Sequence, residues 1–87
     1  MQVTEVRLKL SDPKDYAKAY GSFTLDNDFV VRGIRVLENK EGSLFVGFPS
    51  RENAKGEYMD ICFPMNSTLR QDITAVVISE YEKLCEV

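Results

Sequence analysis

Residues 23–38 read FTLDNDFVVRGIRVLE, the pattern of two β-strands joined by a tight polar turn. Asp26-Asn27-Asp28 supplies side chains that tolerate the left-handed backbone of a short hairpin. The run 29–37 is rich in β-branched residues, but each of its alternating faces carries one arginine. Gly33 is therefore a candidate bulge that switches the alternation within this strand.

One further strand precedes this hairpin, and the first strand of the hairpin begins earlier in the chain, at residue 17. Residues 3–10, VTEVRLKL, alternate apolar and charged side chains, which predicts a strand with Val6, Leu8 and Leu10 facing inward. Residues 17–25 place Ala19, Gly21, Phe23 and Leu25 on one face, with Gly21 a candidate bulge or point of close approach. The short polar turns between the runs favour antiparallel pairing.

The middle of the chain is less regular. Residues 43–48, SLFVGF, are almost wholly apolar and predict a central strand of the sheet. Residues 49–56, PSRENAKG, indicate a polar, basic-leaning loop. Residues 58–63, YMDICF, predict a short strand that Pro64 ends.

The C-terminal part changes to a helical period. We expect one helix of about 18 residues, ending near Cys85, with Thr68 and Gln71 forming a capping box. The fold class predicted is α+β: an antiparallel sheet of about four to five strands followed by one C-terminal amphipathic helix, in a single domain over residues 1–87. The apolar stripe of the helix consists of Leu69, Ile73, Val76, Val77, Tyr81 and Leu84.

Composition argues against several classes of protein. The 87 residues contain no histidine, which removes Ser–His and Cys–His couples, and the two cysteines, Cys62 and Cys85, lie far apart. We expect no enzymatic activity, no catalytic residues, no metal site and no cofactor. MQVTEVRLKL is not a signal peptide, and no apolar run is long enough to span a membrane, so we expect a cytoplasmic protein. We expect its cysteines to be reduced, with Cys62 buried; one disulfide is the alternative.

The net charge of −3 is distributed unevenly. Residues 1–55 carry +1 and residues 56–87 carry −4, so the strand region is the more positive part. Arg51 and Lys55 lie in the expected loop, and Arg70 lies in the first helical turn, where the helix dipole disfavours a cation. These three cations are candidates for binding a polyanion; the alternative is an ordinary solvated surface.

The order of several motifs resembles the SpoVG family (stage V sporulation protein G, "putative septation protein"). The resemblance runs from about residue 2 to residue 84 and rests on TLD-x-x-FVV-x-x-IRV, LFV-x-x-PS, G-E-Y-x-DI and P-x-NS-x-x-R. It implies an α+β homodimer of the bacterial cytoplasm that binds DNA or RNA and regulates gene expression linked to sporulation or septation. It also implies no catalysis and no cofactor.

The resemblance makes Arg51, Lys55 and Arg70 the first nucleic-acid contacts, with Arg32 and Arg35 next because their exposure depends on strand phase. Glu52, Met59 and Asp72 stand where the family has basic residues, and Phe63 where it has histidine. Each lost phosphate contact weakens binding and its salt dependence. A protein-interaction module with weakened nucleic-acid binding is therefore the alternative function, and a protein partner the alternative ligand.

Overall fold

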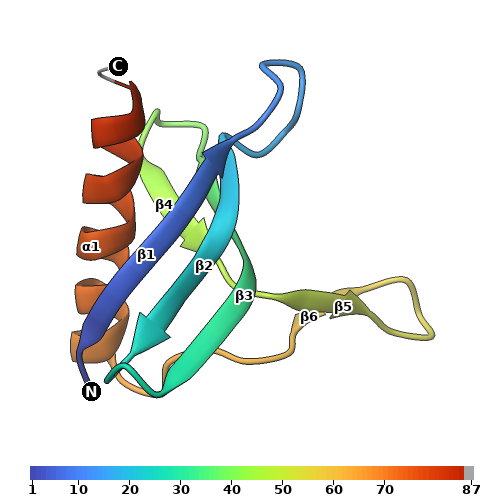
Figure 1. The fold of residues 1–87 in the computed structure, drawn as a ribbon. Coiled ribbons are helices and arrows are strands. Elements are labelled where there is room, and N and C mark those ends of the chain that lie inside the picture. Colours follow the sequence, from blue (N-terminus) through green and yellow to red (C-terminus); the bar gives the residue numbers. More distant parts are fainter. Residues whose placement is uncertain (86–87) are drawn as a thin grey trace.

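The first four strands form one antiparallel sheet in the order β1-β2-β3-β4, and a separate two-stranded sheet and a C-terminal helix complete the fold (Figure 1). This computed structural model describes residues 1–85 and confirms the α+β class. The last two residues of the expected domain lie outside the described residues. The elements are β1 (Val3–Leu10), β2 (Ala19–Leu25), β3 (Phe29–Glu38), β4 (Leu44–Gly47), β5 (Ser50–Glu52), β6 (Tyr58–Asp60) and α1 (Ser67–Cys85).

The β2–β3 hairpin confirms the predicted turn. Asp26 and Asn27 have φ values of 51° and 59°, and the Asp28 amide donates to the Leu25 carbonyl at 2.9 Å. Asp26 and Asn27, the central residues of this β-turn, therefore both occupy the left-handed region.

The predicted bulge lies at Gly33. Gly21 pairs with Ile34 and Ser22 pairs with Arg32, so Gly33 is the extra residue, and its φ is 80°. Across the sheet, Gly21 is a point of close approach, because a Cβ there would lie 1.9 Å from the Arg7 carbonyl oxygen. The bulge shifts the alternation and turns both arginines of β3 to one face.

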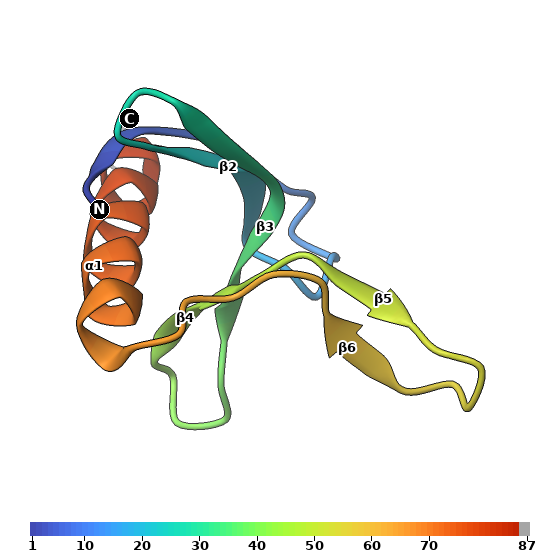
Figure 2. The same ribbon diagram turned by 90° about the horizontal axis from the view of Figure 1, so that it is seen from below.

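Helix α1 lies across one face of the sheet and contacts β1, β4 and β3, and the sheet curves around it (Figure 2). The helix buries Ile73 and Val77, whereas Val76, expected on the buried stripe, is 40% exposed. Leu10 of β1, also expected to face inward, is exposed. The core consists of Ala19, Phe23, Leu25, Val31, Ile34, Val36, Val46, Phe48, Ile73 and Val77.

The prediction of a central strand at residues 43–48 was wrong. Strand β4 pairs with β3 alone and forms an edge of the sheet. Its apolar character has another cause: α1 covers one side, where Val46 and the following Phe48 are buried, while Phe45 on the other side is exposed. An edge strand can be apolar when a helix covers it.

The loop expected at residues 49–56 is instead the first half of a hairpin. Ser50 pairs with Asp60, and the Asn53 side-chain oxygen accepts from the Lys55 and Glu57 amides at 2.9 and 3.0 Å, which closes the turn. We call residues 50–60 the arm. It extends away from the body on the side opposite α1 (Figures 1 and 2).

The start of α1 also differs from the expected capping box. The Asn66 side-chain oxygen accepts from the Leu69 amide at 2.7 Å, so Asn66 is the N-cap and Thr68 lies within the first turn. Within residues 1–85, no helix is long and apolar enough to cross a membrane.

Candidate nucleic-acid interface

The sheet has an outer face, the side of β1, β2 and β3 turned away from α1, and two rows of side chains cross it. Arg7 pairs with Ser22, which pairs with Arg32. Lys9 pairs with Tyr20, which pairs with Arg35. Since neighbouring strands are about 4.8 Å apart, the backbones of the two cationic residues in each row lie about 10 Å apart.

Positive charge gathers on this outer face although the whole chain carries −3. Glu5 forms a salt bridge with Arg7, at 3.0 Å, and Asp15 lies beside Tyr20. The face thus sets five cations against two carboxylates, a balance of +3. The Glu5–Arg7 pair is largely exposed, so it weakly competes with an anionic ligand. The five cations are Arg7, Lys9, Lys18, Arg32 and Arg35.

Arg35 forms three hydrogen bonds that join neighbouring segments at the outer face. Its guanidinium donates to the Tyr16 hydroxyl at 2.8 Å, to the Phe48 carbonyl at 3.1 Å and to the Ser50 hydroxyl at 3.5 Å. These bonds connect the β1–β2 loop with the base of the arm. Arg35 is half-buried, whereas Arg32 is exposed and free for a ligand.

Two tyrosines lie among these cations. The Tyr20 hydroxyl donates to an Asp15 carboxylate oxygen at 2.9 Å. This hydrogen bond raises the pKa of Tyr20 above its usual value, with smaller contributions from desolvation and from the negative charge of Asp15. The Tyr16 ring lies 6.0 Å from the Arg35 guanidinium carbon. Both hydroxyls are thus held, which fixes the position of the rings.

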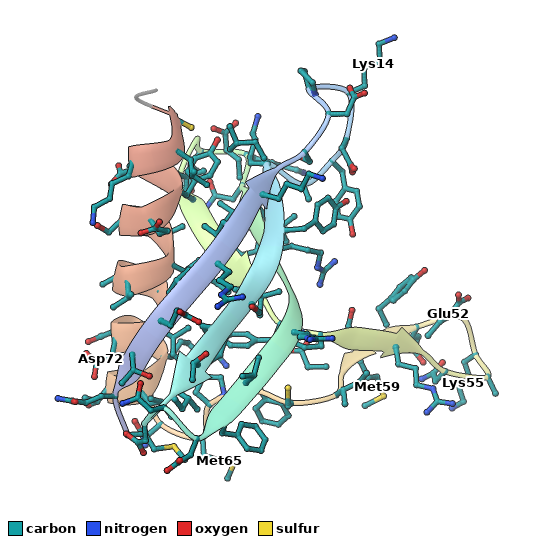
Figure 3. The ribbon with its side chains drawn as sticks, in the orientation of Figure 1. Lys14, Glu52, Lys55, Met59, Met65 and Asp72 are labelled. Carbon is teal, nitrogen blue, oxygen red and sulfur yellow. The ribbon has the colours of Figure 1, made fainter. Side chains whose placement is uncertain are left out.

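The arm carries Arg51 on β5 and Lys55 at the turn, but it is not a basic element. Glu52, Glu57 and Asp60 give the arm three acidic residues against these two cations, a balance of −1. Glu52 and Lys55 lie close to the end of the arm (Figure 3). Arg51 pairs across the ladder with Met59. The two cations of the arm therefore lie apart from each other, among a larger number of acidic side chains.

Arg70 lies elsewhere, on the α1 side of the molecule. Its guanidinium carbon is 5.5 Å from the centroid of the Phe48 ring, a cation–π contact. This contact offsets the unfavourable position of a cation at a helix N-terminus. The sequence-predicted set thus divides into three places: Arg32 and Arg35 on the outer face, Arg51 and Lys55 on the arm, and Arg70 beside Phe48.

Arg7, Lys9 and Lys18 of the outer face are not among the residues predicted from the sequence as candidate contacts. The signal was present, because β1 alternates Arg7 and Lys9 outward, and Lys18, just before β2, precedes the outward Tyr20 by two residues. These residues come together on one face only when β1 and β2 are paired in the observed register, and the sequence alone does not give that register.

The acidic and cysteine side chains of the described residues do not cluster as metal ligands would. Within residues 1–85 no group of three histidine, cysteine or acidic side chains is placed to hold a metal ion. Cys62 and Cys85 are free thiols, and both are exposed. The expected burial of Cys62 was therefore wrong, because β6 ends at Asp60 before reaching it.

An apolar surface lies at the opposite end of the sheet from the β1–β2 loop. Phe29, Phe63 and Met65 surround a hollow of about 360 Å³ floored by core residues, and Met65 is 89% exposed. Figure 3 shows Met65 pointing away from the body. Phe29 and Phe63 are also more than half exposed, and exposed apolar side chains that cluster in this way mark interaction sites.

Comparison with known proteins gives a consistent result. The sequence model of the SpoVG family matches residues 1–83. "Putative septation protein SpoVG" of Lachnoclostridium phytofermentans is 44% identical over 82 residues, covering 94% of this chain and 87% of the relative. "Putative septation protein SpoVG 2" of Listeria monocytogenes is 45% identical over 86 residues, covering 99% and 83%. The Thermoanaerobacter relative of the same name is 41% identical over 86 residues, covering 99% and 92%.

Proposed function

The chain belongs to the SpoVG family, and we propose that it is a regulatory protein that binds DNA or RNA to modulate gene expression linked to sporulation or septation. The names of its relatives support the septation link. In this proposal the protein acts in the cytoplasm, without catalysis or cofactor, and as a homodimer.

The observation that carries the binding proposal is the charge of the outer face. A balance of +3 on one face of a chain with net charge −3 is a strong local concentration. Phosphate contacts from such cations supply most of the affinity of sequence-independent nucleic-acid binding. The substitutions Glu52, Met59 and Asp72, which lower the charge of the arm and helix, leave this face untouched.

The homodimer proposal rests on the apolar surface around Phe29, Phe63 and Met65. A chain of 87 residues buries only about 60–65% of its unfolded surface, so an association that covers exposed apolar groups adds stability. In a two-fold dimer one patch meets its own copy, which requires no second complementary surface. A dimer also doubles the outer-face cations available to one ligand.

Two double variants test the proposal. We expect Arg7→Glu with Arg32→Glu to weaken binding to labelled DNA or RNA by about tenfold or more at ~100 mM salt, because two phosphate contacts become repulsive. The matched control is Arg51→Glu with Lys55→Glu, which makes the same charge change on the arm. Fluorescence anisotropy gives both affinities, and circular dichroism establishes that the variants fold.

A larger loss of affinity in Arg51→Glu with Lys55→Glu than in Arg7→Glu with Arg32→Glu would place the binding site on the arm. The proposed function would then be unchanged. No binding by the unaltered protein, even at low salt, would exclude the proposed function. Capture of a defined protein partner by that protein would then favour the alternative, an interaction module that uses the apolar surface.

A further inference from the structure

We infer that the outer face binds nucleic acid as a single strand, with bases stacked on Tyr16 and Tyr20 and phosphates held by the surrounding cations. This inference rests on the proposed function and deepens it, because it names the form of the ligand and the residues that select it.

Both rings are exposed and held in place before any ligand arrives. Tyr16 is 68% exposed and Tyr20 is 37% exposed. Their hydroxyls bond to Arg35 and Asp15, at 2.8 and 2.9 Å. An aromatic ring that is already ordered loses little conformational entropy when a base stacks on it, so more of the stacking energy remains as affinity.

The cations surround Tyr20 at distances that suit a single nucleic-acid strand crossing the outer face. In its row Tyr20 lies between Lys9 and Arg35, and the next row contains Arg7 and Arg32. Lys18 precedes Tyr20 by two residues on the same side, about 7 Å along the strand. A nucleic-acid strand whose base covers Tyr20 therefore has Lys9 and Lys18 next to that base, and Arg7 and Arg32 one row further, to contact its phosphates.

The combination of rings and cations favours a single strand over a duplex. Bases within a duplex stack on one another and offer no free face to a protein ring, whereas the bases of a single strand do. The arm also projects on this side of the molecule (Figure 2). Arg35 connects the base of the arm to the outer face through its bonds to Phe48 and Ser50. A flexible strand can follow that corner more easily than a stiff duplex.

The test compares one labelled DNA strand of about 16 nucleotides, mixed in sequence, with the duplex formed by its complement. We expect the unaltered protein to bind the strand more tightly. Tyr20→Ala should weaken strand binding by about 5- to 150-fold, the equivalent of one lost base stack. Tyr20→Phe, which retains the ring but loses the hydroxyl bond to Asp15, should weaken strand binding less than Tyr20→Ala does. Tyr58→Ala removes an exposed arm tyrosine and is the matched control.

Tyr16→Ala provides a second truncation outside the strand ladder, which keeps the test valid if Tyr20→Ala fails to fold. Strand affinity lost in both alanine variants, with duplex affinity unchanged, supports the inference. Duplex binding as tight as strand binding, with no effect of either alanine variant, overturns the inference yet preserves the proposed function. Absence of binding to both forms overturns both.

Discussion

At the scale of single residues, Asn66 shows how local rules can favour the wrong neighbour. Asn66, Ser67 and Thr68 are three consecutive residues that all cap helices well. The match of Thr68 and Gln71 to a capping box favoured Thr68, but the Asn66 side chain makes the bond to the Leu69 amide. Pro64, two residues before this cap, is buried, so the chain is anchored to the body where it enters the helix.

Replacing Asn66 should therefore destabilise the protein, whereas replacing Thr68 should not. We expect Asn66→Ala to lower the free energy of unfolding by about 1 kcal/mol, because one amide of the first turn loses its partner. That corresponds to a fall in Tm of about 4–8 °C. Thr68→Ala, an exposed position, serves as the control in the same thermal melts. A larger loss from Thr68→Ala than from Asn66→Ala would contradict the assignment of the cap.

At the scale of elements, the predictable parts were those with a strong local signal. The β2–β3 hairpin followed from its turn residues, and the bulge at Gly33 followed from an alternation that otherwise left an arginine on each face. The position of β4 at the edge did not follow, because an apolar run looks the same whether strands or a helix bury it. The arm was missed because its strands, Ser50–Glu52 and Tyr58–Asp60, are three residues long and mostly polar.

The candidate site was predictable only in part for a related reason. Arg32 and Arg35 were recognised as dependent on strand phase, and the bulge at Gly33 determined that phase. The assembly with Arg7 and Lys9 depends on the register between β1, β2 and β3, which no single segment encodes. Arg70 was singled out by its unfavourable position, and its contact with Phe48 is a tertiary feature outside sequence spacing.

At the scale of the whole molecule, two surfaces with different properties face different directions. The outer face of the sheet is cationic, and the area around Phe29, Phe63 and Met65 is apolar. A division of this kind lets one surface hold a second copy of the chain while the other stays open to a ligand. The proposed dimer and the proposed nucleic-acid site therefore do not compete for the same residues.

The dimer can be tested by placing charge in the apolar surface. We expect the protein to sediment at twice the monomer mass and Phe63→Asp with Met65→Asp to sediment as a monomer, because burying two carboxylates against their own copies is costly. Phe45→Asp, on the exposed side of β4 and outside the hollow, should leave the dimer intact. Monomeric mass for the unaltered protein at every concentration would refute the dimer.

The most direct test of the account is the salt dependence of binding by the unaltered protein. Four outer-face cations, Arg7, Lys9, Lys18 and Arg32, are available to phosphates. For a single strand, the logarithm of the association constant should fall with the logarithm of salt concentration with a slope of about −3, measured by anisotropy over ~50–200 mM salt. A slope near zero, or no binding at the lowest salt, would contradict a function based on these cations.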